Sequence, residues 1–74
     1  MQEVIYMTLI QRGQCYAHVT ATKYFEIRSV FLDISGLMMV HFIYYDSKDD
    51  QEHYASRSYS EMAQLIERGT LIRD

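Results

Sequence analysis

The hydrophobic pattern of this chain is most distinctive at residues 37–45, where nine largely apolar residues follow one another without alternating with polar ones. A strand that is apolar on both sides is typical of a strand buried on both faces. The chain has one segment with a clear helical period, and a single short helix covers only one face of a sheet. We therefore expect something outside the folded monomer to cover part of the other face.

Four further segments have the β-branched and aromatic composition of strands. Residues 3–12 are followed at Gly13-Gln14 by a junction compatible with a tight hairpin, and Ser35-Gly36 predicts a two-residue turn into residues 37–45. The four predicted strands are residues 3–12, 14–20, 24–34 and 53–57.

The Ser35-Gly36 turn fixes the predicted register, with Phe31 opposite Val40, so one face of this strand pair is almost wholly apolar. We expect the helix on that face and most aromatic rings in the core beneath it, namely Phe25, Phe31, Phe42 and Tyr44. The reverse face is mixed, and we assign its apolar part to a subunit interface formed by Val30, Leu32, Met39, His41 and Ile43. A slip of one residue would exchange the two faces.

The helix is the best-specified element. Ser58 and Glu61 fit a capping box, and Gly69 is placed to end the helix. Its apolar residues recur at helical spacing and are expected in the core: Tyr59, Met62, Leu65 and Ile66. Residues 70–72 either form a short edge strand or trail from the helix.

The order ββββ(β)α predicts a single α+β domain over residues 1–74, with a mostly antiparallel sheet of four to five strands and one C-terminal helix packed on one face. The alternative is a small five-stranded barrel closed by the helix. Long, bulky strands and only 3 glycines favour the open sheet.

Composition and charge narrow the function classes. The hydrophobic fraction of 49% excludes a disordered chain. With Cys15 as the single cysteine, an intrachain disulfide is excluded, so we expect a homodimer to supply the missing stability.

The net charge is −3, and residues 46–52 hold four carboxylates against one lysine. No basic stripe is present, so we expect no direct nucleic-acid binding. Without a leader-like segment or a membrane-length apolar run, we expect no membrane association and a cytoplasmic protein.

Candidate chemistry is sparse. Cys15 and His18 stand three apart, which on a strand directs them to opposite faces, so we interpret Cys15 as a buried structural thiol. The carboxylates of residues 46–52 lack the central glycine and terminal glutamate of a calcium loop, and we interpret them as a solvated turn. We therefore expect no catalytic residue, metal or cofactor, and no enzyme activity.

These observations favour a small acidic interaction protein that binds and modulates or inhibits a larger protein, as inhibitors, immunity proteins, antitoxins and phage proteins directed against host enzymes or defences do. The target would be a larger protein, such as a nucleic-acid enzyme with a basic groove. We assign target binding to the acidic turn and adjacent tyrosines: Tyr45, Asp46, Asp49, Asp50, Glu52 and Tyr54. The alternative is a small RNA- or DNA-binding regulator that stacks bases on exposed tyrosines, for which Tyr16, Tyr24 and Tyr45 are the candidates.

Overall fold

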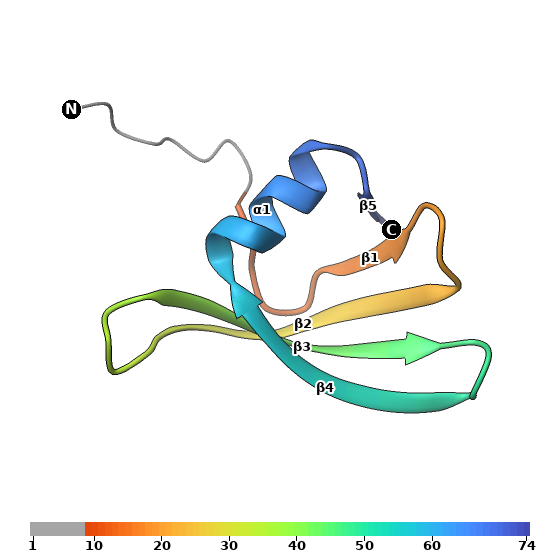
Figure 1. The fold of residues 1–74 in the computed structure, drawn as a ribbon, viewed down its shortest axis with the longest axis horizontal. Helices are drawn as coiled ribbons and strands as arrows, with labels where there is room; N and C mark the ends of the chain where they lie inside the picture. Colours follow the sequence, from red (N-terminus) through yellow and green to blue (C-terminus); the bar gives the residue numbers. More distant parts are fainter. Residues whose placement is uncertain (1–8) are drawn as a thin grey trace.

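A computed structural model describes residues 9–74 of the chain. They form one antiparallel sheet in the order β4-β3-β2-β1-β5, with a single helix, α1, across one face (Figure 1). The elements are β1 (Cys15–His18), β2 (Lys23–Leu32), β3 (Met38–Asp46), β4 (Gln51–Ser58), α1 (Tyr59–Glu67) and β5 (Leu71–Arg73). The predicted α+β class is confirmed. The edge strands β4 and β5 stand at opposite ends of the order, so the sheet stays open.

The structure differs from the predicted strands near the start of the described residues, and it decides the alternative left open after the helix. Within the predicted strand 3–12, residues 3–8 lie outside the described residues, and residues 9–12 are not in a strand. The predicted hairpin at Gly13-Gln14 is absent, because both residues bond instead to Ile27 of β2: the Gly13 N–H donates to the Ile27 carbonyl, and the Ile27 N–H donates to the Gln14 carbonyl. Residues 71–73 form an edge strand that pairs with β1.

The ends of α1 follow from its sequence. Ser58 is the N-cap, and its hydroxyl both accepts from the Glu61 N–H and donates to the Glu61 carboxylate, each at 3.1 Å. At the other end, Gly69 has φ +79°, a left-handed conformation that favours glycine. The N–H groups of Gly69 and Thr70 donate to the carbonyls of Ile66 and Leu65, the pattern of a Schellman motif.

The core lies between α1 and the sheet face beneath it, which we call the inner face; the opposite face is the outer face. Met62 and Ala63 of α1 pack against Ile27, Val40 and Phe42 of the sheet. The predicted helix residues Tyr59, Leu65 and Ile66 are half-buried against this core. Tyr16, a candidate for an exposed stacking residue, is instead 2% exposed and belongs to the core, so that prediction is wrong.

A β-bulge at Arg28 changes the predicted pairing of β2 with β3. The register shifts between Ile27, which faces Phe42, and Ser29, which faces His41. Residues beyond the bulge therefore change sides: Val30 pairs with Val40, and Leu32 pairs with Met38. The predicted faces of β3 hold, but Phe31 lies on the outer face rather than in the core.

The β2–β3 turn is also longer than predicted. Asp33 and Leu37 pair, and Gly36, with φ +84°, ends a three-residue loop instead of a two-residue turn at Ser35-Gly36. The Asp33 carboxylate closes this loop by accepting from the Ser35 hydroxyl at 2.6 Å and from the N–H groups of Ser35 and Leu37. The hydrogen bond from the Ser35 hydroxyl, followed by that from the Leu37 N–H, holds the pKa of Asp33 below its ordinary value.

This turn makes the stability of the fold depend on pH. Because the pKa of Asp33 is lower in the folded state than in the unfolded state, the stabilisation is present above about pH 4 and is lost as the pH falls through the folded pKa. We expect Asp33→Asn to be less stable than the wild type near neutral pH and to lose that difference in acid. Urea denaturation of both proteins at about pH 7 and about pH 3 measures this. A stability difference that stays constant with pH would contradict it.

Candidate functional site

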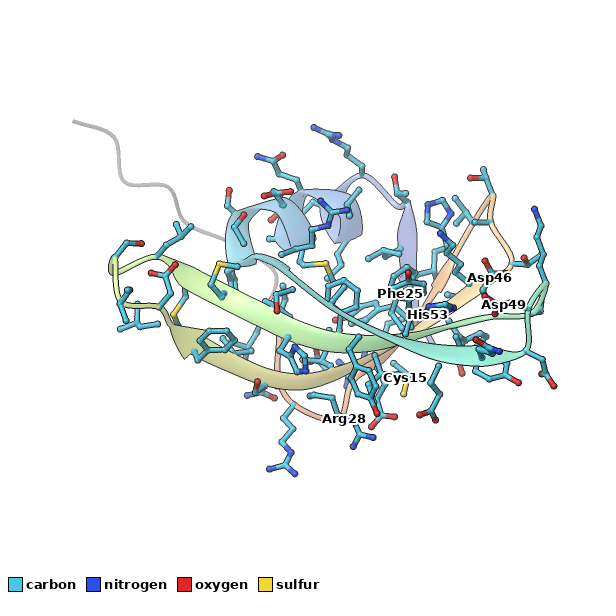
Figure 2. All side chains as sticks on the ribbon, turned by 60° about the horizontal axis from the view of Figure 1, so that its bottom comes forward. Cys15, Phe25, Arg28, Asp46, Asp49 and His53 are labelled. Atoms are coloured by element: carbon cyan, nitrogen blue, oxygen red, sulfur yellow. The ribbon has the colours of Figure 1, made fainter. Side chains whose placement is uncertain are left out.

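The candidate site is the outer face of the sheet, because α1, the one helix within residues 9–74, lies on the inner face. Cross-strand partners share a face, so the register gives the composition of this one. Figure 2 shows Cys15 and Arg28 on the side away from α1, and Phe25 on the side of α1. The outer face carries Cys15, Tyr24, Glu26, Phe31, Met39, His41, Ile43, Tyr45, Glu52 and Tyr54.

Three tyrosines on three different strands are exposed on this face. Tyr24 pairs directly with Tyr45, while Tyr54 is 67% exposed beside Ile43. Ile43 is only 7% exposed, so it lies at the bottom of the face and is shielded by its neighbours' side chains. A shallow hollow of about 150 Å³ lies between Tyr24 and Tyr45 above Ile43. The hollow therefore has tyrosine rings at its sides and the aliphatic side chain of Ile43 at its base.

Two of the tyrosines are held by carboxylates at the margins of the face. The Tyr45 hydroxyl donates to the Asp50 carboxylate, and this hydrogen bond raises the pKa of Tyr45. A side-chain hydrogen bond with Asp74 likewise raises the pKa of Tyr24. Both phenols therefore keep their protons and point their hydroxyls toward negative charge.

Tyr54 is oriented by a ring rather than by a carboxylate. Its ring stacks on His41 with a centroid distance of 6.3 Å and an interplanar angle of 11°. His41 is in turn placed by the Ser56 hydroxyl, 3.3 Å from its Nδ1. His41 is half-buried on the outer face, as its position in the predicted register required.

The acidic residues predicted to bind the target do not all share this face. Glu52 pairs with Tyr45, and Asp50 bonds to Tyr45, so both belong to the outer face. Asp49 bonds instead to His53 at 2.8 Å, on the inner side, where Figure 2 shows both residues. The turn divides its carboxylates because Asp50 adopts φ +57°, a left-handed conformation that reverses the chain within the turn.

Asp46 also lies on the inner side, at the end of β3. Its carboxylate accepts from the Lys48 N–H at 3.0 Å and from the Thr22 hydroxyl at 3.2 Å. The hydrogen bond from Lys48 is the main reason that the pKa of Asp46 is lowered. Asp46 thus holds the turn together. Of the residues predicted to bind a target, the structure brings together Tyr45, Asp50, Glu52 and Tyr54.

The predicted dimer interface is divided in the same way. Met39, His41 and Ile43 lie on the outer face, as predicted. Val30 and Leu32 do not, because the bulge at Arg28 turns both toward the inner face, and their assignment to the same surface is wrong. Val30 lines an apolar hollow of about 460 Å³ beside α1.

Cys15 and His18 stand on opposite faces, as their spacing predicts. Cys15 is half-buried on the outer face instead of fully buried, and its thiol lies 3.8 Å from the Gly13 carbonyl oxygen. Within residues 9–74, no group of three or more His, Cys, Asp or Glu side chains is placed to hold a metal ion.

Sequence reasoning missed Asp74 as a member of the outer face. Asp74 follows β5, and its N–H bonds to the Cys15 carbonyl, which brings the end of the chain beside Tyr24. Tyr24, which the sequence offered only as an exposed stacking residue, does lie on the outer face, where it is 47% exposed and pairs with Tyr45.

Comparisons of the chain with protein-family models, with curated proteins and with solved structures found no match. In the part of the chain that the structure describes, no helix is long and apolar enough to cross a membrane. Inferences about function therefore rest on the arrangement of the side chains.

Proposed function

We propose that this chain is a non-enzymatic interaction module that binds a basic surface of a larger protein through its outer face and thereby modulates that protein. The observation that carries the proposal is the group of exposed tyrosines, Tyr24, Tyr45 and Tyr54, on a sheet face that no helix within residues 9–74 covers. Tyrosine supplies a large contact area with few rotatable bonds, and it is enriched among the residues that dominate binding energy.

The charges around these tyrosines favour a basic partner. Glu26, Asp50, Glu52 and Asp74 surround Tyr24 and Tyr45. Arg28 is the one basic side chain facing them on β2, and it already lies 3.5 Å from Glu26. Carboxylates around the tyrosines attract a positively charged surface and speed association with it. It also repels phosphates, which disfavours the alternative of stacking RNA or DNA bases on the same tyrosines.

The other half of the outer face carries little charge and suits a second copy of the chain. Around Phe31, Met39 and His41, the cross-strand neighbours are Ser29, Ser56 and Ser58. Two copies would repel each other through their acidic halves and would meet instead through this neutral half. We therefore retain the homodimer as part of the proposal, with Met39 and His41 as its interface; Ile43 is 7% exposed among the tyrosines of the acidic half and is left out of it. The half-exposed free thiol of Cys15 favours a reducing compartment such as the cytoplasm.

The proposal is tested by capture of the partner with matched variants. The tagged full chain, Tyr54→Ala and Gln64→Ala are each used to capture proteins from the native host, and bound proteins are quantified by mass spectrometry. Gln64 is exposed on α1, so its replacement leaves the outer face intact. We expect a basic partner retained by the wild type and Gln64→Ala and depleted about tenfold or more with Tyr54→Ala, because hot-spot truncations cost about 2 kcal/mol or more. Equal capture by all three proteins would contradict the proposal.

A further inference from the structure

The inner face holds a groove that the proposed partner does not use. It has a volume of about 240 Å³ and is lined by residues of all five strands and by Met62 and Leu65 of α1. Its floor is formed by the rings of Phe25, Phe42 and Tyr44, and its rim by His18, Lys23 and Arg57. Phe25 and Tyr44 are only half-buried and offer accessible ring surface, whereas Phe42 is 3% exposed and belongs to the core beneath them.

The floor is a continuous aromatic surface. The centroid of the Phe25 ring lies 5.5 Å from that of Phe42 and 5.9 Å from that of Tyr44. The Tyr44 ring is itself stacked on His53, with a centroid distance of 4.8 Å and an interplanar angle of 13°. The planes of these rings are tilted, by 59° between Phe25 and Phe42 and by 36° between Phe25 and Tyr44, so a flat ligand ring would stack on Phe25 and meet the neighbouring rings at an angle.

The charge of the groove is opposite to that of the whole molecule. The chain has a net charge of −3, yet no carboxylate lines the groove, and Lys23 and Arg57 stand on its rim. The Lys23 ammonium lies 5.3 Å from the centroid of the Tyr44 ring. Arg57 is 3.9 Å from Glu61, but both side chains are more than half exposed, so this ion pair is weak and Arg57 can leave it to contact a ligand. Asp46 also attracts Lys23, from the end of β3.

His18 adds a hydrogen-bond donor to this rim. Its Nδ1 faces the N–H groups of Thr20 at 3.2 Å and Ala21 at 3.1 Å, which both donate to it. The ring hydrogen of the neutral imidazole therefore resides on Nε2. That nitrogen is left to donate from a ring that lines the groove.

We propose that this groove binds a small planar aromatic anion of the mononucleotide class, with the base on Phe25 beside Tyr44 and the phosphate beside Lys23 and Arg57. The volume is below the roughly 300–1,000 Å³ of pockets for drug-sized ligands, so it accommodates one ring system with the phosphate at the rim. The net charge of −3 disfavours a polymer with many phosphates, which makes a single nucleotide the better match. The site is on the opposite face from the tyrosines of the proposed partner surface and is independent of that proposal.

The test is a nuclear magnetic resonance titration of the full chain, labelled with ¹⁵N, with adenosine monophosphate. We expect saturable shifts at Lys23, Phe25, Tyr44 and Arg57, with Tyr54 on the outer face unaffected. Adenosine and inorganic phosphate, each offering half of the ligand, should bind about tenfold more weakly or worse. A short oligothymidylate should bind no more tightly than the mononucleotide.

Matched variants identify the groove. Lys23→Gln and Arg57→Gln should each weaken adenosine monophosphate about tenfold, the usual effect of losing one charge-assisted contact. Lys48→Gln in the turn and Arg28→Gln on the outer face remove the same charges elsewhere and should leave affinity unchanged. The two groove variants lie on different strands, so the test survives a folding failure of either one.

The inference would be overturned by absence of saturable shifts in the groove, by equal affinity for inorganic phosphate and adenosine monophosphate, or by equal weakening by the control variants. Tighter binding of the oligonucleotide would also overturn it, because that result would assign the surface to a nucleic-acid strand.

Discussion

Ile27→Ala is expected to leave a large share of the chains unfolded at room temperature. Ile27 is 0% exposed on β2 and packs in the centre of the core under α1. Truncation of a buried isoleucine to alanine costs about 2–5 kcal/mol through lost transfer energy and the cavity left behind. A core of this size supplies only about 3–5 kcal/mol of net stability, so the loss is comparable to the total. Far-ultraviolet circular dichroism with urea denaturation measures the effect.

Ile34→Ala is the matched control for this prediction. Ile34 stands in the β2–β3 loop with its side chain fully in solvent, so the same chemical change should alter the free energy of unfolding by less than about 0.5 kcal/mol. If the two variants were equally stable, Ile27 would not be at the centre of the core.

The second large effect is expected from Met39→Glu, which should convert a dimer into a monomer of half the mass. Met39 lies on the neutral half of the outer face, where a second copy would bury it. A glutamate without a partner at such an interface costs several kcal/mol, enough to separate the subunits at micromolar concentration. Light scattering after size exclusion measures the mass directly.

Met38→Glu provides a neighbouring control. Met38 precedes Met39 on β3 but lies on the opposite face, and it is 42% exposed. A charge there should leave the dimer intact. A wild-type chain of monomer mass, or a Met39→Glu protein of unchanged mass, would remove this interface.

The sequence allowed the class of the fold and the faces of β3 to be predicted, for a local reason. Val40, Phe42 and Tyr44 alternate with Met39, His41 and Ile43, and this alternation needs no knowledge of the partner strand. The helix could be predicted for the same reason, since Ser58 and Gly69 are capping residues that act on backbone groups close to them in the sequence.

The pairing of β2 could not be predicted from the sequence, because it depends on contacts between segments that are distant along the chain. Gly13 and Gln14 bond to Ile27 at the point where Arg28 bulges, and no residue pattern near Arg28 indicates this. One inserted residue moved Val30 and Leu32 to the inner face and Phe31 to the outer face.

The candidate site was predicted in part for the same reasons. Tyr45 and Tyr54 follow strand alternation and share the outer face, and Glu52, which the sequence placed in the turn, joins them because β4 begins at Gln51. The carboxylates of Asp49 and Asp50 point to opposite sides of the sheet because Asp50 adopts a left-handed conformation. The sequence around Asp50 does not indicate this conformation.

The most direct test of the outer face as the interaction surface is hydroxyl-radical footprinting of the full chain, alone and bound to the captured partner. Tyrosine oxidation is followed residue by residue with mass spectrometry. We expect strong protection of Tyr45 and Tyr54 in the complex, with Leu65 of α1 oxidised at an unchanged rate. Protection of Leu65 with Tyr45 and Tyr54 still fully reactive would place the partner on the helix side and contradict the account.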